Sequence, residues 1–149
     1  MSSQAAQAYD EGAVAFFIEN LCQEADLIYR FGYALTLSTV GAAELVNETY
    51  ARIVSEIPSL MEEDSQKLRL FLIRNAWDVY QGWSKEFRPT LAPIHELLAE
   101  ATIEVRSILI LIDGIGLTPK EVAQVIRMDE VEVRCNLAEG RRRMIKFNT

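Results

Sequence analysis

The chain has 149 residues, with 15 basic and 22 acidic side chains and a formal charge of −7. Half of its residues are apolar, which excludes a disordered composition and allows a buried core. Two cysteines cannot form a disulfide framework, the N-terminus lacks the positive charge of a secretory signal, and the longest uncharged apolar run, residues 107–112, is too short to cross a bilayer. We therefore expect a soluble cytoplasmic protein of one domain or two very small ones.

Charge is distributed unevenly along the sequence. Residues 118–149 carry seven basic and five acidic side chains, a net charge of +2, so the rest of the chain carries −9. The overall acidity argues against indiscriminate nucleic-acid binding, whereas the mildly basic end could contact an anionic partner. The two parts of the chain are thus expected to present different surfaces.

Three helices are predicted in the first half, because apolar residues recur there at intervals of three and four. The first spans residues 11–37. The second spans residues 40–57, with a cap at Ser38 and a stop at Pro58, and a loop follows over residues 59–64. The third begins after a cap at Asp64 or Ser65. The predicted buried stripes are Ala43, Val46, Tyr50, Ile53, Val54 and Ile57 in the second helix, and Leu68, Leu72, Ala76, Val79 and Trp83 in the third.

Residues 88–93 (RPTLAP) mark the predicted boundary, since two prolines in six residues are incompatible with a helix interior. We assign residues 1–88 to a first helical module, residues 89–93 to a linker and residues 94–149 to a second module. The predicted fold class is all-α, with two small helical modules.

The second module contains the clearest local signals. A helix over residues 94–113 is expected to end at Gly114 and Gly116. Thr118-Pro119-Lys120-Glu121 is a capping box with proline at the first position of a short helix over residues 119–126. The chain turns at Arg127-Met128, and a second capping signature over residues 129–132 opens a helix to about residue 147. This pattern predicts a helix-turn-helix with a compact core of Val122, Ile126, Met128, Val133 and Leu137.

Short sequence matches occur in the same order along both modules. Gly116-Leu117-Thr118, Glu121-Val122-Ala123, Val125-Ile126, Val133-Arg134, Leu137 and Arg141, preceded by residues 105–111 (VRSILIL), resemble the C-terminal helix-turn-helix of extracytoplasmic-function sigma factors. In that branch of the sigma-70 family, the module reads the −35 promoter element. Residues 43–50 (AELVNETY) resemble the family's helix that binds core RNA polymerase, and residues 72–75 (LIRN) its helix that melts and reads the −10 element. The resemblance covers nearly the whole chain.

The sequence departs from this family where DNA contacts are expected. The aligned positions of the recognition helix hold Glu132, Asn136 and Glu139, only Arg141 remains basic, and Arg127 replaces the usual glycine of the turn. Acidic residues in the first turn stabilise the helix dipole but repel phosphates. We therefore expect weakened −35 reading, with the carboxylate-bearing side of the last helix facing outward.

The resemblance leaves two functions open. The chain could be an alternative sigma factor that binds RNA polymerase core and promoter DNA. It could equally be a sigma mimic that binds an anti-sigma factor through an apolar groove between the modules, and so frees the real sigma factor. Neither function involves a membrane or a small-molecule substrate.

The candidate site residues are those that match the family's functional positions. Contacts with polymerase or a partner are expected from Glu44, Leu45, Asn47, Glu48 and Arg52. DNA contacts are expected from Arg134, Asn136, Arg141, Arg142, Arg143 and Lys146 in the last helix, and from Asn75, Trp77 and Tyr80, with Trp83, in the third. Two alternatives stay open, because aromatic residues at helical spacing also suit a core, and charged pairs four residues apart also suit a solvated face.

No enzyme, metal or cofactor is predicted. His95 has no second histidine or cysteine at ligand spacing, and a catalytic triad cannot be argued from one histidine. Gly114 and Gly116 follow no predicted strand, so they form no phosphate-binding loop.

Overall fold

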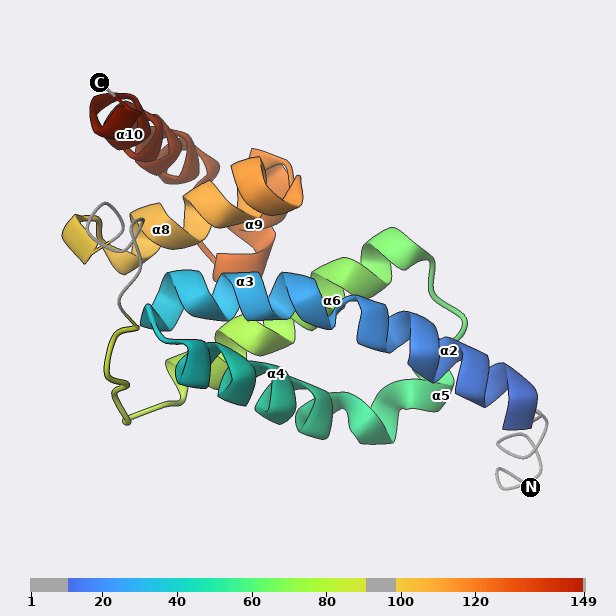
Figure 1. Cartoon of the computed structure of the whole chain (residues 1–149). Coiled ribbons are helices and arrows are strands. Elements are labelled where there is room, and N and C mark those ends of the chain that lie inside the picture. Colours follow the sequence, from blue (N-terminus) through green and yellow to red (C-terminus); the bar gives the residue numbers. More distant parts are fainter. Residues whose placement is uncertain (1–10, 91–98, 149) are drawn as a thin grey trace.

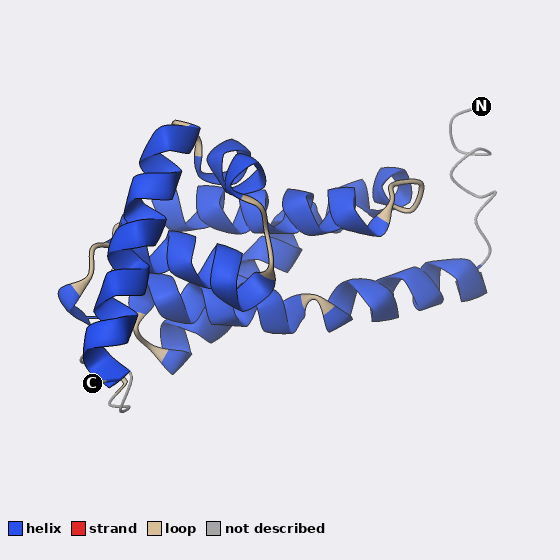
Figure 2. Cartoon of the chain, turned by 90° about the horizontal axis from the view of Figure 1, so that it is seen from above, coloured by secondary structure: helices blue, strands red, loops and turns tan. Residues whose placement is uncertain are grey.

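The computed structural model describes residues 11–90 and 99–148, with side chains described as far as residue 145. The described residues form helices joined by turns and loops and contain no strand, which confirms the predicted fold class (Figure 1; Figure 2). The start of the predicted helix at residue 94, together with His95, lies outside the described residues, and so does most of the linker.

The first predicted helix is divided into two. Helix α2 (Glu11–Gln23) and helix α3 (Ala25–Thr36) meet at Glu24, so the expectation of one helix over residues 11–37 was wrong. At the break the Tyr50 hydroxyl donates to the carbonyl of Leu21 at 2.6 Å, and the Glu24 amide bonds that same carbonyl three residues back. A contact from another helix thus interrupts the regular hydrogen bonding. Helix α2 extends from the bundle in both views (Figure 1; Figure 2).

Helix α4 (Thr39–Ile53) begins as predicted, because the Ser38 side chain accepts from the amide of Gly41. It ends earlier than expected and continues as a 3₁₀ turn, η1 (Val54–Glu56), and a short helix, α5 (Ile57–Leu60). Pro58 lies in the first turn of α5, where proline is tolerated, so it does not end the helical path. The predicted stripe is only partly correct. Ile53 is buried, and Val46, Tyr50 and Ile57 are partly buried against the core, as predicted. Ala43 and Val54 are exposed, and the buried positions also include Ala42, Leu45 and Thr49.

Helix α6 (Ser65–Gln81) is capped by Asp64, whose carboxylate accepts from the amide of Lys67 at 2.8 Å. Its Leu68, Leu72 and Ala76 are buried as predicted, whereas Val79 is only partly buried. Residues 82–90 then return in an extended conformation towards the start of α4. There the Thr90 amide donates to the Leu37 carbonyl at 2.8 Å.

The second half contains helix α8 (Ile103–Leu109), a π-helical turn η2 (Ile110–Ile115), helix α9 (Pro119–Ile126) and helix α10 (Glu130–Asn148). The predicted uninterrupted helix to residue 113 was wrong, because Thr102 caps a new helix by accepting from the amide of Val105. Gly116 ends η2 with φ 97°. The capping box at Thr118 and the tight turn after α9 are present as predicted.

The two halves of the chain pack against each other. Helix α8 lies on α3 and α9 lies on α6, while α10 covers α8 (Figure 1). Fully buried side chains from both halves, including Phe31, Leu72, Ile108 and Val122, belong to one hydrophobic cluster. The predicted modules therefore meet through an apolar interface.

Candidate functional site

An apolar groove lies between helix α3 of the first half and α8, η2 and α10 of the second. Its volume is about 440 Å³, and its lining is mainly apolar, with charges at Arg30, Arg106 and Asp113. The remaining lining residues are Tyr29, Tyr33, Ala34, Leu109, Ile110, Gly114 and Met144. The hydroxyl of Tyr33 is buried and has no hydrogen-bond partner among the described residues. The groove therefore has a mainly apolar surface, and the Tyr33 hydroxyl is buried.

Local sequence explains the width of this groove. The π-helical turn η2 carries Ile110, Asp113 and Gly114 along one wall. A side chain at Gly114 would collide with Ile110, since an added Cβ would lie 2.7 Å from its Cδ1. The π-helical turn and the missing side chain together keep this wall open, and π-helical turns often occur at functional sites.

Arg106 holds the floor of the groove to helix α3. The residue is 8% exposed, and its guanidinium donates to the carbonyls of Ala34 at 2.6 Å, Leu35 at 3.1 Å and Ala101 at 2.8 Å. Burial lowers the pKa of Arg106 from its ordinary value, because the charged form loses hydration. The sequence does not indicate this role for Arg106, since an arginine in an amphipathic helix is ordinarily a surface residue.

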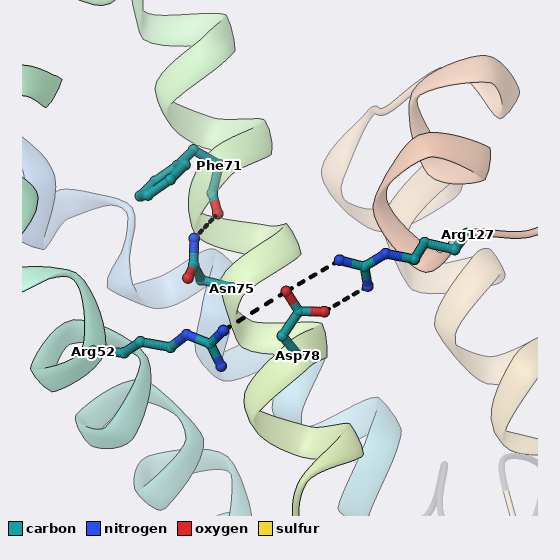
Figure 3. Close-up of polar contacts among 5 residues, drawn as sticks. All are labelled: Arg52, Phe71, Asn75, Asp78 and Arg127. Atoms are coloured by element: carbon teal, nitrogen blue, oxygen red, sulfur yellow. Dashed lines mark hydrogen bonds and ion pairs between the residues drawn. The ribbon is translucent and has the colours of Figure 1, made fainter.

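A second polar contact between the halves joins helix α6 to the turn after α9. Figure 3 shows Asp78 pointing towards Arg127 from the turn after α9 and towards Arg52 from α4. The Nη1 and Nη2 atoms of Arg127 donate to Oδ1 and Oδ2 of Asp78 at 2.6 and 3.3 Å, and Arg52 Nη2 lies 4.0 Å from Oδ2. The hydrogen bond from Arg127 lowers the pKa of Asp78, so the carboxylate stays ionised. We name Arg52, Asp78 and Arg127 the clasp.

The residues predicted to bind polymerase lie on α4 but are not equally accessible. Asn47 and Arg52 are exposed. Glu44 and Glu48 are half-exposed and both accept from the ammonium group of Lys85, at 3.2 Å in the case of Glu48. Leu45 is fully buried in the core, so its side chain supports α4 from within. Glu44, Asn47 and Glu48 border a shallow hollow of about 590 Å³ with Thr39, Val40 and Ala43.

The predicted strand-melting residues pack against one another. Ring centroids are 6.4 Å apart in the pair Phe31–Trp77, 6.1 Å in Trp77–Tyr80, 6.1 Å in Tyr80–Trp83 and 5.3 Å in Trp83–Phe87. Asn75 is buried, and its amide donates to the carbonyl of Phe71 at 2.8 Å (Figure 3). These side chains are partly or fully covered, so stacking on DNA bases would require them to move.

The basic residues of α10 are largely paired with nearby acids. Arg134 pairs with Glu130 at 3.0 Å, Arg141 with Asp113 at 2.8 Å, and both Arg142 and Arg143 with Glu139. Hydrogen bonding from Arg141 lowers the pKa of Asp113. Each of these arginines is thus already paired with a carboxylate of the same chain, and this pair would have to break before the arginine could bind a phosphate.

The carboxylate side of α10 is only partly as predicted. Glu132 is exposed, whereas Glu139 is half-buried beneath its two arginines. Asn136 turns its amide back to donate to the Glu132 carbonyl at 2.8 Å and to the sulfur of Met128 at 3.8 Å. Lys146 belongs to α10, but its side chain lies outside the described residues.

In the described parts of the chain, no group of three or more His, Cys, Asp or Glu side chains could hold a metal ion. Among the same residues, no helix combines the length and apolar character needed to cross a membrane.

The comparisons with known proteins identify a similar fold. No protein-family model matches the sequence, and no curated protein matches it. The structure is similar to that of the sigma factor RpoE in a co-crystal with the anti-sigma factor NepR from Bartonella quintana, with a TM-score of 0.66. The two chains are 16% identical, and the match covers 88% of this chain and 95% of that one. The chain thus has a fold similar to that of a sigma factor.

Proposed function

We propose that the protein is a regulator of transcription initiation that presents a sigma-factor-like surface to an anti-sigma factor. The observation that carries this proposal is the apolar groove between α3 and the helices of the second half. An amphipathic helix binds such a groove by inserting apolar side chains. Tyr29, Tyr33 and Met144 would contact these side chains.

The pairing of basic residues favours this function over promoter reading. Each phosphate neutralised by a protein cation contributes to affinity and salt dependence. Arg134, Arg141, Arg142 and Arg143 would first have to leave their carboxylate partners. Breaking exposed ion pairs costs little, but the freed carboxylates would repel the phosphates and so reduce the gain from phosphate contacts.

The packing of the two halves supports the same choice. Promoter elements named −10 and −35 lie about 80 Å apart along a duplex that rises 3.4 Å per base pair. In the present arrangement α9 lies against α6, and Arg106 of α8 bonds the end of α3. A chain that read both elements would have to break these contacts and expose its shared core, whereas an anti-sigma partner could bind the packed form directly.

A second candidate function, that of an authentic sigma factor, is favoured by the hollow on α4. Asn47 is exposed in this hollow, Arg52 is exposed farther along α4, and Glu44 and Glu48 both bond Lys85. Helix α9, the tight turn and α10 would then act as the DNA-binding helix-turn-helix. Helix α4 would bind RNA polymerase core.

Site-specific photo-crosslinking distinguishes the two functions. A photoreactive amino acid would replace Tyr29 in the groove or Asn47 on α4, and crosslinked proteins from the native host would be identified by mass spectrometry. We expect an anti-sigma factor at Tyr29 and no polymerase subunit at Asn47. Capture of polymerase at Asn47, together with salt-dependent promoter retention by the purified complex, would establish the sigma factor instead.

A further inference from the structure

A second hollow lies between helices α6 and α9, on a different surface from the apolar groove. Its volume is about 240 Å³, and its lining residues are Lys67, Leu70, Phe71, Arg74, Gln124 and Val125. Leu70 and Phe71 are partly buried and pack on the core, so they form a firm apolar floor. The two cations stand at its border and are exposed.

These two cations differ from most others in the protein. Neither Lys67 nor Arg74 makes a side-chain hydrogen bond or an ion pair with any residue that the structure describes. Lys120 also has none, and it lies one helical turn before Gln124 on the same face of α9. Asp78 attracts Arg74 electrostatically, but its hydrogen bonds are with Arg127, and Glu121 is bonded to Gln66 and Thr118. An acidic protein thus carries, around an apolar floor, cations to which no described carboxylate is hydrogen-bonded.

The spacing of the cations indicates what could bind. Lys67 and Arg74 are seven residues apart on one helix, about 10 Å along its axis. Cations at that separation do not converge on a single phosphate. They match two carboxylates that are themselves two helical turns apart, with apolar side chains between them to cover Leu70 and Phe71.

We propose that this hollow is a docking surface for an acidic amphipathic helix of a partner protein. The helix carries carboxylates two turns apart, which pair with Lys67 and Arg74, and apolar residues between them, which cover the floor. Lys120 borders the opposite wall and adds attraction from α9. This surface does not depend on the apolar groove, so the proposed function and this inference can fail separately.

A designed peptide tests the proposal directly. The probe is a fluorescein-labelled peptide of about 20 residues, long enough to be partly helical in water, with glutamates seven residues apart on either side of two leucines. The test variant of the full chain is Lys67→Glu with Arg74→Glu, and the matched control is Arg88→Glu. Arg88 is also exposed and lacks a partner among the described residues, but it lies outside the hollow. Circular dichroism verifies that both variants fold.

Fluorescence anisotropy should show saturable binding that weakens as salt rises. We expect the double variant to bind at least about tenfold more weakly and the Arg88→Glu control to bind within about twofold of the unchanged chain. A peptide with lysines in place of the glutamates should bind the double variant better than it binds the unchanged chain.

Three results would overturn the proposal. The first is no saturable binding at peptide concentrations up to about 1 mM. The second is equal binding by the double variant. The third is tighter binding of an oligothymidine single strand that is lost in the same double variant, because it would assign the surface to nucleic acid.

Discussion

Arg127 and Asp78 lie 49 residues apart in the sequence and form a two-point ion pair that joins the turn after α9 to helix α6 (Figure 3). Arg127 adopts a left-handed backbone conformation, with φ 55°, which glycine adopts more easily. The arginine at this position thus carries a conformational cost, and its side chain supplies a contact that glycine could not.

Breaking this contact should loosen the packing of the two halves. The chain's two cysteines, Cys22 in α2 and Cys135 in α10, are both exposed and can carry spin labels. We expect Asp78→Asn to broaden the distance distribution between the labels, and high salt to do the same in the unchanged chain. Asp26→Asn is the control, because Asp26 pairs with Arg30 inside one helix. Identical distributions for Asp78→Asn and the unchanged chain would show that the clasp does not hold the halves.

Acid should weaken the fold through three carboxylates. Arg127 lowers the pKa of Asp78, Arg141 that of Asp113, and the Thr118 amide that of Glu121. A lowered pKa in the folded state means that the stabilisation is complete above the unfolded-state pKa, about 4, and is lost as pH falls through the folded-state value. The urea concentration at which half of the protein is unfolded should therefore decrease as the pH is lowered below about 4. A variant with Asp78→Asn, Asp113→Asn and Glu121→Gln should have a flatter profile, and an equally steep one would contradict this assignment.

Removing the buried guanidinium of Arg106 should destabilise the whole chain. Arg106→Met leaves the carbonyls of Ala34, Leu35 and Ala101 without their donor, which should cost about 2–5 kcal/mol of the free energy of unfolding. Urea denaturation followed by circular dichroism measures this cost. Arg30→Met removes an exposed arginine from the same groove and should have little effect. Equal stabilities of the two variants would rule out the structural role of Arg106.

The close crossing of α3 and α4 depends on Gly32. A Cβ added there would lie 3.0 Å from the Cα of Ala42, and backbone cannot yield as a flexible side chain can. We expect Gly32→Ala to lower the free energy of unfolding by about 1–3 kcal/mol. Gly82→Ala provides the comparison, since its added Cβ meets only ordinary contacts from 3.5 Å. If both variants unfold at the same urea concentration, the crossing is looser than described.

The Tyr33 hydroxyl gives a test that separates stability from binding. Because it is buried without a partner, Tyr33→Phe should leave the free energy of unfolding unchanged or raise it by up to about 1 kcal/mol. Binding of the partner identified by crosslinking should stay within about twofold, because the ring of Tyr33 lines the groove whereas its hydroxyl is buried. Isothermal titration calorimetry measures the affinity, and a larger loss would show that the hydroxyl takes part in binding.

Local signals in the sequence predicted the end of the chain best. Thr118, Pro119 and Glu121 define the start of α9 by their own hydrogen bonds and backbone preferences, so no distant contact was needed. The break at Glu24 was unpredictable for the opposite reason, because it coincides with a bond from Tyr50. The buried face of α4 was only partly predicted, since its small and apolar residues occupy more than one face, and only packing against α3 decides which face is buried.

The candidate site was less predictable than the fold. Asp78 and Arg106 are charged residues in amphipathic helices, and their partners lie 49 and more than 70 residues away. Leu45 was assigned to a partner surface through the resemblance, although an apolar residue on a packed helix more often belongs to the core. Sequence spacing identifies neighbours within a helix, whereas these contacts depend on how helices cross.

The row of aromatic rings from Phe31 to Phe87 also determines which part of the molecule emits light. Both tryptophans of the chain, Trp77 and Trp83, lie within it, and Tyr80 stands between them as an energy donor. Intrinsic fluorescence therefore reports on the first half and the segment that follows α6, while the far-ultraviolet signal comes from every helix. Melting curves that coincide for the two signals would indicate cooperative unfolding of both halves, and curves that separate would assign the fluorescent transition to the first half.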